Sequence, residues 1–151
     1  MGPGVQVGTG VKIQNYALIY EPAVVSDYAF IGPAAVLTND RNPRSTDLSG
    51  HMKGCEDWDP AGVHVGIGAS VGARAVILAG VSIGDWALVG AGAVVLRDVP
   101  AHGLVVGNPA TRVGWVGRSG KRLIATGEIW RCPITGELYG ETTSGIELQR
   151  A

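Results

Sequence analysis

The chain has 151 residues, of which 46% are hydrophobic and 17% are charged, and its formal net charge is −1. A chain of this length buries one core but seldom two, so one domain is expected. The composition excludes a disordered chain, and the even spread of apolar residues excludes a membrane span. The near-neutral charge gives no field that would attract nucleic acid or an anionic membrane, so neither is an expected partner.

The chain carries no sign of a secreted protein. Its first residues, MGPGVQVG, lack the charged and apolar regions of a signal peptide. Its two cysteines, Cys55 and Cys132, do not make a disulfide framework. We therefore expect a cytoplasmic protein with two free thiols. The 24 glycines and 8 prolines indicate a chain that turns often.

A repeat of six residues runs through most of the chain. Every sixth residue is aliphatic in twelve hexads: Val7, Ile13, Ile19, Val25, Ile31, Leu37, Val65, Val71, Ile77, Ile83, Val89 and Val95. A second column, two residues earlier, holds only alanine or valine: Val5, Val11, Ala17, Ala23, Ala29, Ala35, Val63, Ala69, Ala75, Val81, Ala87 and Ala93. Because neither column has an exception, each hexad is expected to occupy the same structural environment.

The repeat predicts a parallel β-helix. A hexad is too short for a hairpin and too β-branched for a helix, so it indicates a short strand followed by a corner. Three such sides make a coil of 18 residues, and twelve hexads make about four coils stacked roughly 4.8 Å apart. The fold class is therefore all-β, with aliphatic side chains inside. A β-sandwich, the alternative, would have irregular turn spacing.

A polar insertion interrupts the repeat between Leu37 and Val65. The extra residues form a loop at 41–62, with the sequence RNPRSTDLSGHMKGCEDWDPAG. A long loop that interrupts a rigid solenoid is more often functional than accidental, so a site is expected here. The alternative is a solvated loop that the fold merely tolerates.

The pattern resembles the hexapeptide-repeat, left-handed β-helix acyltransferases over residues 5 to about 117. The resemblance implies a left-handed coil, a homotrimer with active sites between subunits, and acetyl-CoA as co-substrate. The segment TNDRNPRS, which begins at Thr38, is similar to the branch that N-acetylates amino groups of nucleotide-linked sugars. Galactoside-type and maltose-type relatives place a histidine at the corner that Asn39 occupies here.

Asn39 is accordingly the expected catalytic residue. Its amide exchanges hydrogen bonds but takes up no proton near neutral pH, so it would orient an amine that arrives unprotonated. The proton would pass to the departing coenzyme A thiolate or to water. Four residues are expected to contact the acceptor: Glu21, Asp40, Asn42 and Arg44. The alternative for Asn39 is an ordinary turn residue.

Histidines offer a rival base. His64 faces outward where the loop rejoins the repeat, and it is the second expected catalytic residue. His51 lies inside the loop, and His102 lies beyond the coils and is expected at the surface. With His64 as base, the enzyme would be an O-acetyltransferase.

The second half of the chain resembles the coenzyme A-binding half of the family. Ala73 and Ala91 are 18 residues apart and share a corner, and the resemblance makes their backbone N–H groups contacts of the pantetheine arm. Arg97 and Arg112 are the preferred partners for the nucleotide phosphates. Together with Ala79, which shares the corner of Glu21, Asn39 and Arg97, the expected cofactor-binding residues are Ala73, Ala79, Ala91, Arg97 and Arg112.

The last residues depart from the repeat. The tail at 118–151 follows the β-helix domain at 1–117, which contains the insertion at 41–62, and is predicted as a short hairpin-like cap packed through Trp130, Leu138 and Tyr139. Related chains can carry a zinc ribbon here. A ribbon needs four sulfur or nitrogen ligands, and this tail offers only Cys132, so no metal is expected.

These observations predict an acetyl-CoA-dependent N-acetyltransferase that acts on the amino group of a nucleotide-linked amino sugar. Two alternatives stay open. One is the O-acetyltransferase with His64 as base, and the other is a noncatalytic trimeric β-helix that serves as a scaffold.

Overall fold

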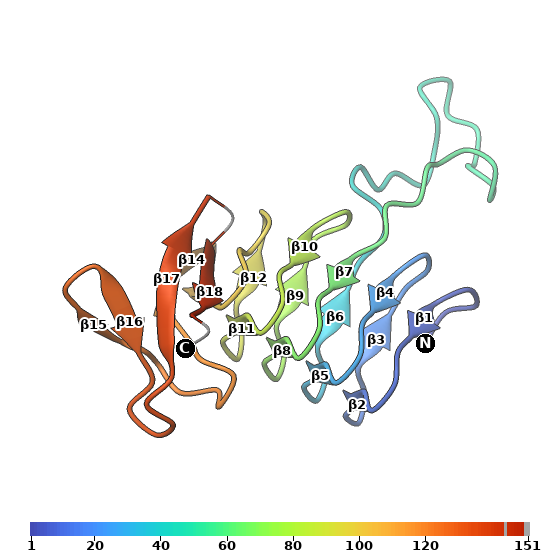
Figure 1. The fold of residues 1–151 in the computed structure, drawn as a ribbon. Helices are drawn as coiled ribbons and strands as arrows, with labels where there is room; N and C mark the ends of the chain where they lie inside the picture. Colours follow the sequence, from blue (N-terminus) through green and yellow to red (C-terminus); the bar gives the residue numbers. More distant parts are fainter. Residues whose placement is uncertain (144, 150–151) are drawn as a thin grey trace.

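The computed structural model describes residues 1–143 and 145–149, and within these ranges the chain contains strands and turns but no helix. It therefore has, in these ranges, no helix that is long and apolar enough to cross a membrane. Twelve two-residue strands form the repeat (Figure 1): β1 Gln6–Val7, β2 Lys12–Ile13, β3 Leu18–Ile19, β4 Val24–Val25, β5 Phe30–Ile31, β6 Val36–Leu37, β7 His64–Val65, β8 Ser70–Val71, β9 Val76–Ile77, β10 Ser82–Ile83, β11 Leu88–Val89 and β12 Val94–Val95.

The strands stack into three parallel sheets, which confirms the predicted β-helix. Sheet A has the order β1-β4-β7-β10, sheet B contains β2-β5-β8-β11, and sheet C has the order β3-β6-β9-β12. Within each sheet every residue pairs with the residue one coil away, as Val7 does with Val25. The pairing continues across the insertion, because Val25 pairs with Val65. The twelve strands thus make four three-sided coils.

The β-helix continues beyond the last predicted hexad. Val99 bridges Ile83 in parallel, and β13 (Gly103–Gly107) adds to sheet B beside β11. Strand β14 (Ala110–Trp115) then turns back antiparallel to β13 and ends the stack. The hexad pattern is lost in these strands, so only a partial fifth coil is formed.

The interior is built from the two aliphatic columns. In the central coils these side chains are almost completely buried, and Ile31, Val65 and Ile77 are at most 1% exposed. In the first coil, Val7 and Ile13 are 41% and 38% exposed although they occupy the same columns. The same residue type therefore contributes very differently to stability along the stack.

Replacing Ile77 with alanine is expected to lower the free energy of unfolding by about 3 kcal/mol, because it leaves a cavity in a closed core. The matched change Ile13→Ala should cost only about 1 kcal/mol, since Ile13 is already partly hydrated. Thermal unfolding followed by circular dichroism measures the difference, which corresponds to a Tm gap of roughly 6 °C. Equal losses at the two positions would contradict the proposed gradient of burial.

The insertion leaves the β-helix between β6 and β7 and projects away from the coils (Figure 1). An antiparallel bridge between Thr46 and Met52 closes its tip, where the carboxylate of Asp47 accepts hydrogen bonds from the backbone N–H groups of Ser49 and His51. The conformation of the insertion therefore depends in part on hydrogen bonds within the loop itself.

The C-terminal segment forms a four-stranded antiparallel sheet, which is more than the short hairpin that the sequence predicts. Its strands pair in the order β15 (Ile124–Thr126), β16 (Ile129–Arg131), β17 (Leu138–Thr142) and β18 (Gly145–Leu148). The sheet has a separate buried cluster: Trp115, Leu123, Cys132, Tyr139 and Ile146. Of the predicted packing residues, Tyr139 is buried, Trp130 is partly buried and Leu138 is exposed. Residues 144, 150 and 151 of the predicted tail lie outside the described residues.

His102 joins this sheet to the end of the β-helix and is buried rather than at the surface. Its ring meets the Tyr139 ring edge-on, with centroids 5.0 Å apart, and its Nδ1 lies 2.9 Å from the Val116 carbonyl oxygen. A nitrogen that faces a carbonyl must carry the proton and donate it. Burial lowers the pKa of His102, and the hydrogen bond to Val116 offsets this only in part.

Acidification is expected to loosen the contact between the tail and the β-helix. The folded state holds His102 neutral with a lowered pKa, so the unfolded state binds more protons and stability falls as the pH drops below the ordinary value of 6.5. The charged groups that face the ring are Arg118, Asp85 and Glu137. Tm measured between pH 7.5 and 5.5 should decline in the native protein and decline less in His102→Phe. Parallel slopes for the two proteins would contradict this role of His102.

Candidate functional site

The corner between sheets C and A holds one column of predicted site residues. We call it the C–A corner, and it contains the second residue after each strand of sheet C: Glu21, Asn39, Ala79 and Arg97. The Nδ2 of Asn39 donates a hydrogen bond to the Glu21 carbonyl oxygen at 2.7 Å. The Asn39 carbonyl accepts one from the Ala61 N–H at 2.8 Å, where the insertion returns to the β-helix.

These bonds fix what Asn39 can do. Because its amide nitrogen is occupied by the Glu21 carbonyl, its Oδ1 is the atom left to accept a hydrogen bond from an incoming N–H or O–H group. Asn39 is half-buried, which limits its motion, whereas Arg97 is exposed and Ala79 is buried. The corner can therefore orient an acceptor but supplies no base from Asn39 itself.

The insertion forms two adjoining pockets beside this corner, of about 460 and 370 Å³. Both are lined by Asp40, Lys53 and Trp58. Asn42 lines the first pocket and Arg44 the second, so the structure brings three of the predicted acceptor residues together. The first pocket also reaches Ala61, the hydrogen-bond partner of Asn39.

Three residues that line these two pockets were not predicted from the sequence: Arg41, Lys53 and Trp58. A lysine and a tryptophan inside a charged insertion were the available signal. Arg41 lies over Gly80, and a Cβ at that glycine would collide with the guanidinium. Gly80 has φ +75°, so the position suits glycine on both grounds. Arg41 thereby ties the start of the insertion to the next coil.

The three histidines lie in different surroundings. His51 is in the exposed tip of the insertion, where its Nδ1 lies 3.4 Å from the Asp47 carboxylate. His102 is buried against the C-terminal sheet. His64 begins β7 on the outer face of sheet A, is exposed, and lies in register between Val24 and Ser82. His64 lies three residues after Ala61, whose backbone N–H donates to Asn39 at the C–A corner.

The corner between sheets B and C, which we call the B–C corner, carries Ala73 and Ala91. The Gly92 N–H donates a hydrogen bond to the Ala73 carbonyl at 2.8 Å, so the two turns stack one coil apart. A Cβ on Gly72 would lie 2.5 Å from the Ala91 nitrogen, which shows how closely the backbones approach. This corner presents small residues and backbone, as the predicted pantetheine contact requires.

One aliphatic sheet face separates the two corners. The outward residue of every strand in sheet C is aliphatic: Leu18, Val36, Val76 and Val94. Leu78 and Leu96 flank this face at the C–A corner and are 38% and 46% exposed. Within one chain, therefore, Asn39 and the Ala73–Ala91 pair lie on opposite edges of sheet C and do not meet.

Arg112 lies in β14, which adds to sheet B beyond β13. Its guanidinium carbon is 4.0 Å from the centre of the Trp115 ring, a cation–π arrangement. Both residues line a pocket of about 310 Å³ between the end of the β-helix and the C-terminal sheet, together with Glu141. In residues 1–143 and 145–149, no group of three or more histidine, cysteine or acidic side chains is placed to hold a metal ion.

Residues 62–97 match the family model described as "Bacterial transferase hexapeptide (six repeats)". This segment covers β7 to β12, the coils in which the six-residue period is also visible in the structure. The chain thus carries a hexapeptide-repeat β-helix. The match covers the B–C corner at Ala73 and Ala91 and begins at Gly62, the last residue of the insertion, so it does not include Asn39.

Known proteins share this hexapeptide-repeat β-helix. The chain is 34% identical over 109 residues to serine acetyltransferase 4 of Arabidopsis thaliana, a match that covers 72% of this chain and 25% of that protein. The structure resembles the serine acetyltransferase of Neisseria gonorrhoeae, with a TM-score of 0.60, 29% identity and coverage of 75% of this chain and 39% of the other.

A second similar structure is a variant of the GDP-perosamine N-acetyltransferase of Caulobacter crescentus in complex with coenzyme A and GDP-perosamine. The TM-score is 0.55 at 28% identity, and the match covers 74% of this chain and 51% of the other. The hexapeptide-repeat chain thus spans between a quarter and about half of the length of these three proteins.

Proposed function

We propose that the protein is an acetyl-CoA-dependent acetyltransferase that works as a homotrimer. The proposal is supported by the hexapeptide-repeat match and by the likeness to acetyltransferases. The observation that carries it is the placement of the two half-sites. A polar acceptor pocket beside Asn39 and a small-residue corner at Ala73 and Ala91 flank the same aliphatic face.

The separation of these half-sites is the reason for proposing an oligomer. A partly exposed aliphatic stripe across four coils is typical of a contact surface. If copies pack through sheet C in a closed ring, the C–A corner of one copy lies against the B–C corner of the next. The acceptor held near Asn39 would then meet a donor held along Ala73 and Ala91 of the neighbouring copy.

The first candidate acceptor is a hydroxyl group, with His64 as general base. His64 takes the hydroxyl proton while the oxygen attacks the thioester carbonyl of acetyl-CoA. The tetrahedral intermediate then expels the coenzyme A thiolate, which receives the proton from His64, so that an ester and free coenzyme A are formed. This candidate is supported by the likeness to serine acetyltransferases and by the exposed position of His64 near the C–A corner.

The second candidate acceptor is an amine on a nucleotide-linked sugar. It is supported by the free Oδ1 of Asn39, which would accept an amine N–H, and by the likeness to the perosamine enzyme. Arg44 and Lys53 would pair with phosphates, and Trp58 would stack on a base. An unprotonated amine needs no side-chain base, because the coenzyme A thiolate or water can take the proton.

Calorimetric titration with acetyl-CoA and with coenzyme A tests the proposal, followed by measurement of thiol release with hydroxyl and amine acceptors. Binding of acetyl-CoA and release of coenzyme A in the presence of one acceptor class are expected. Failure to bind acetyl-CoA at millimolar concentration would leave the noncatalytic trimeric scaffold as the better interpretation.

A further inference from the structure

Two loops of the C-terminal segment share one spacing. The first contains Val116, Ser119, Gly120 and Leu123, and the second contains Cys132, Thr135, Gly136 and Tyr139, each at relative positions one, four, five and eight. Both glycines have positive φ, at +73° and +74°. Leu123 and Tyr139 both belong to the buried cluster of the sheet. The two loops therefore share a spacing and a left-handed glycine at its fifth position.

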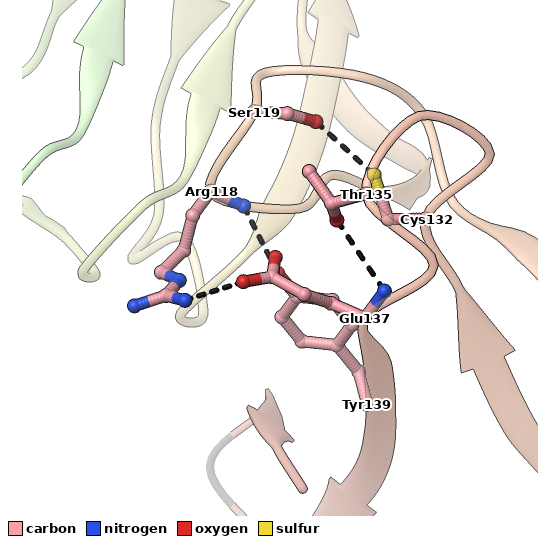
Figure 2. Close-up of polar contacts among 6 residues, drawn as sticks. All are labelled: Arg118, Ser119, Cys132, Thr135, Glu137 and Tyr139. Carbon is pink, nitrogen blue, oxygen red and sulfur yellow. Dashed lines mark hydrogen bonds and ion pairs between the residues drawn. The ribbon is translucent and has the colours of Figure 1, made fainter.

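Figure 2 shows that these loops face each other. The Ser119 Oγ lies 3.2 Å from the Cys132 Sγ, and Thr135 adjoins the same thiol. Burial alone would raise the pKa of Cys132, but the hydrogen bonds from Ser119, Thr135 and the loop backbone favour the thiolate and lower it to about 7. Two of the other three positions, Ser119 and Thr135, thus lie beside the Cys132 sulfur.

A second set of contacts joins the two loops to each other away from the Cys132 thiol. The Arg118 guanidinium forms an ion pair with the Glu137 carboxylate, and the backbone N–H of Arg118 donates to the Tyr139 hydroxyl at 3.1 Å. That hydroxyl donates in turn to Glu137 Oε2 at 2.8 Å. Arg118, followed by Tyr139, lowers the pKa of the Glu137 carboxyl. The first loop is thereby joined to the second through three side chains.

The residues present do not fit a zinc ion. Paired loops with ligands at the first and fourth positions are the spacing of a two-knuckle zinc ribbon, which uses four sulfur or nitrogen ligands. Here those positions hold Val116, Ser119, Cys132 and Thr135. A valine cannot ligate, two hydroxyls are poor zinc ligands, and the nearby guanidinium adds a positive charge.

We propose that the C-terminal sheet is a zinc-ribbon fold whose metal has been replaced by a side-chain network. Ser119, Cys132 and Thr135 occupy the ligand positions and hold each other by hydrogen bonds, while the Arg118–Glu137–Tyr139 contacts join the loops. The folding of this sheet is then independent of metal and dependent on the ion pair between the loops.

The first test uses the native protein and single variants. Metal analysis should find less than a tenth of a zinc ion per chain, and EDTA should leave Tm unchanged. Arg118→Met and Glu137→Gln should each lower the Tm of the C-terminal sheet by roughly 3 °C. Near-ultraviolet circular dichroism measures this Tm. Lys121→Met, whose side chain lies in the same loop and makes none of these contacts, is the matched control. Stoichiometric zinc, or a Tm that EDTA lowers and these variants do not, would overturn the proposal.

The second test restores the site. The triple variant Val116→Cys, Ser119→Cys and Thr135→Cys, with Cys132 kept, should bind one Co²⁺ with the intense visible absorption of a tetrahedral thiolate complex. Adding Cys132→Ser to the triple variant should weaken that absorption. A folded triple variant with no such spectrum would show that the four positions do not converge. If the triple variant does not fold even with zinc, the Tm values of Arg118→Met and Glu137→Gln decide whether the proposal stands.

Discussion

Replacing His64 with alanine is expected to lower kcat/KM for acetyl transfer to a hydroxyl acceptor by roughly 10²- to 10⁴-fold, the usual contribution of a general base. The physical reason is that a neutral hydroxyl is a poor nucleophile until its proton is removed, and neither Asn39 nor a backbone group can accept it.

The matched control for this experiment is His51→Ala. His51 lies at the tip of the insertion and contacts Asp47, so its loss should leave kcat/KM nearly unchanged. If His64→Ala keeps full activity with an intact trimer, while Asn39→Ala loses on the order of 100-fold, the hydroxyl mechanism is wrong. That pair of results would favour the amine acceptor.

Two inactive variants are expected to restore activity when they share a trimer. Asn39→Ala removes the acceptor contact, and Ala91→Trp fills the corner that the donor would follow, so each homotrimer should lose on the order of 100-fold in kcat/KM. In a mixed ring of three, one site receives both intact edges, so about one third of the native activity should return. Co-expression with two different tags and tandem purification isolates the mixed rings.

The control for this complementation is a mixed trimer that contains two differently tagged copies of the same variant, and it should stay inactive. Sedimentation should show that every preparation is trimeric. Mixed trimers with no recovered activity would mean that each chain carries a complete site, and the shared-site proposal would then fail. Recovered activity in a preparation that is not trimeric would equally contradict the shared-site proposal.

The fold was largely predictable because the repeat imposes one environment on each column. A residue such as Ile77 or Val89 must be aliphatic wherever it falls in the stack, so twelve unbroken hexads predict the coils and their register. Beyond Val95 the six-residue period is lost, so the repeat did not predict strands β13 and β14. The four-stranded tail was underestimated for the same reason.

The candidate site was less predictable, since it depends on contacts between distant segments. The corner phase predicted that Glu21 and Asn39 lie together, and the structure shows a direct hydrogen bond between them. Periodicity carries no information on how an irregular insertion folds, so the roles of Lys53 and Trp58 as pocket walls were missed. The burial of His102 depends on Tyr139, which lies 37 positions later and belongs to a sheet the repeat does not describe.

The placement of the two half-sites on opposite edges of sheet C would also make activity depend on protein concentration. A contact that joins unlike edges is head-to-tail, so two copies build one complete centre and leave two loose ends, whereas a closed ring leaves none. Specific activity should therefore fall when the enzyme is diluted below its assembly constant, and an excess of acetyl-CoA, by bridging neighbouring chains, should shift that threshold to lower concentrations.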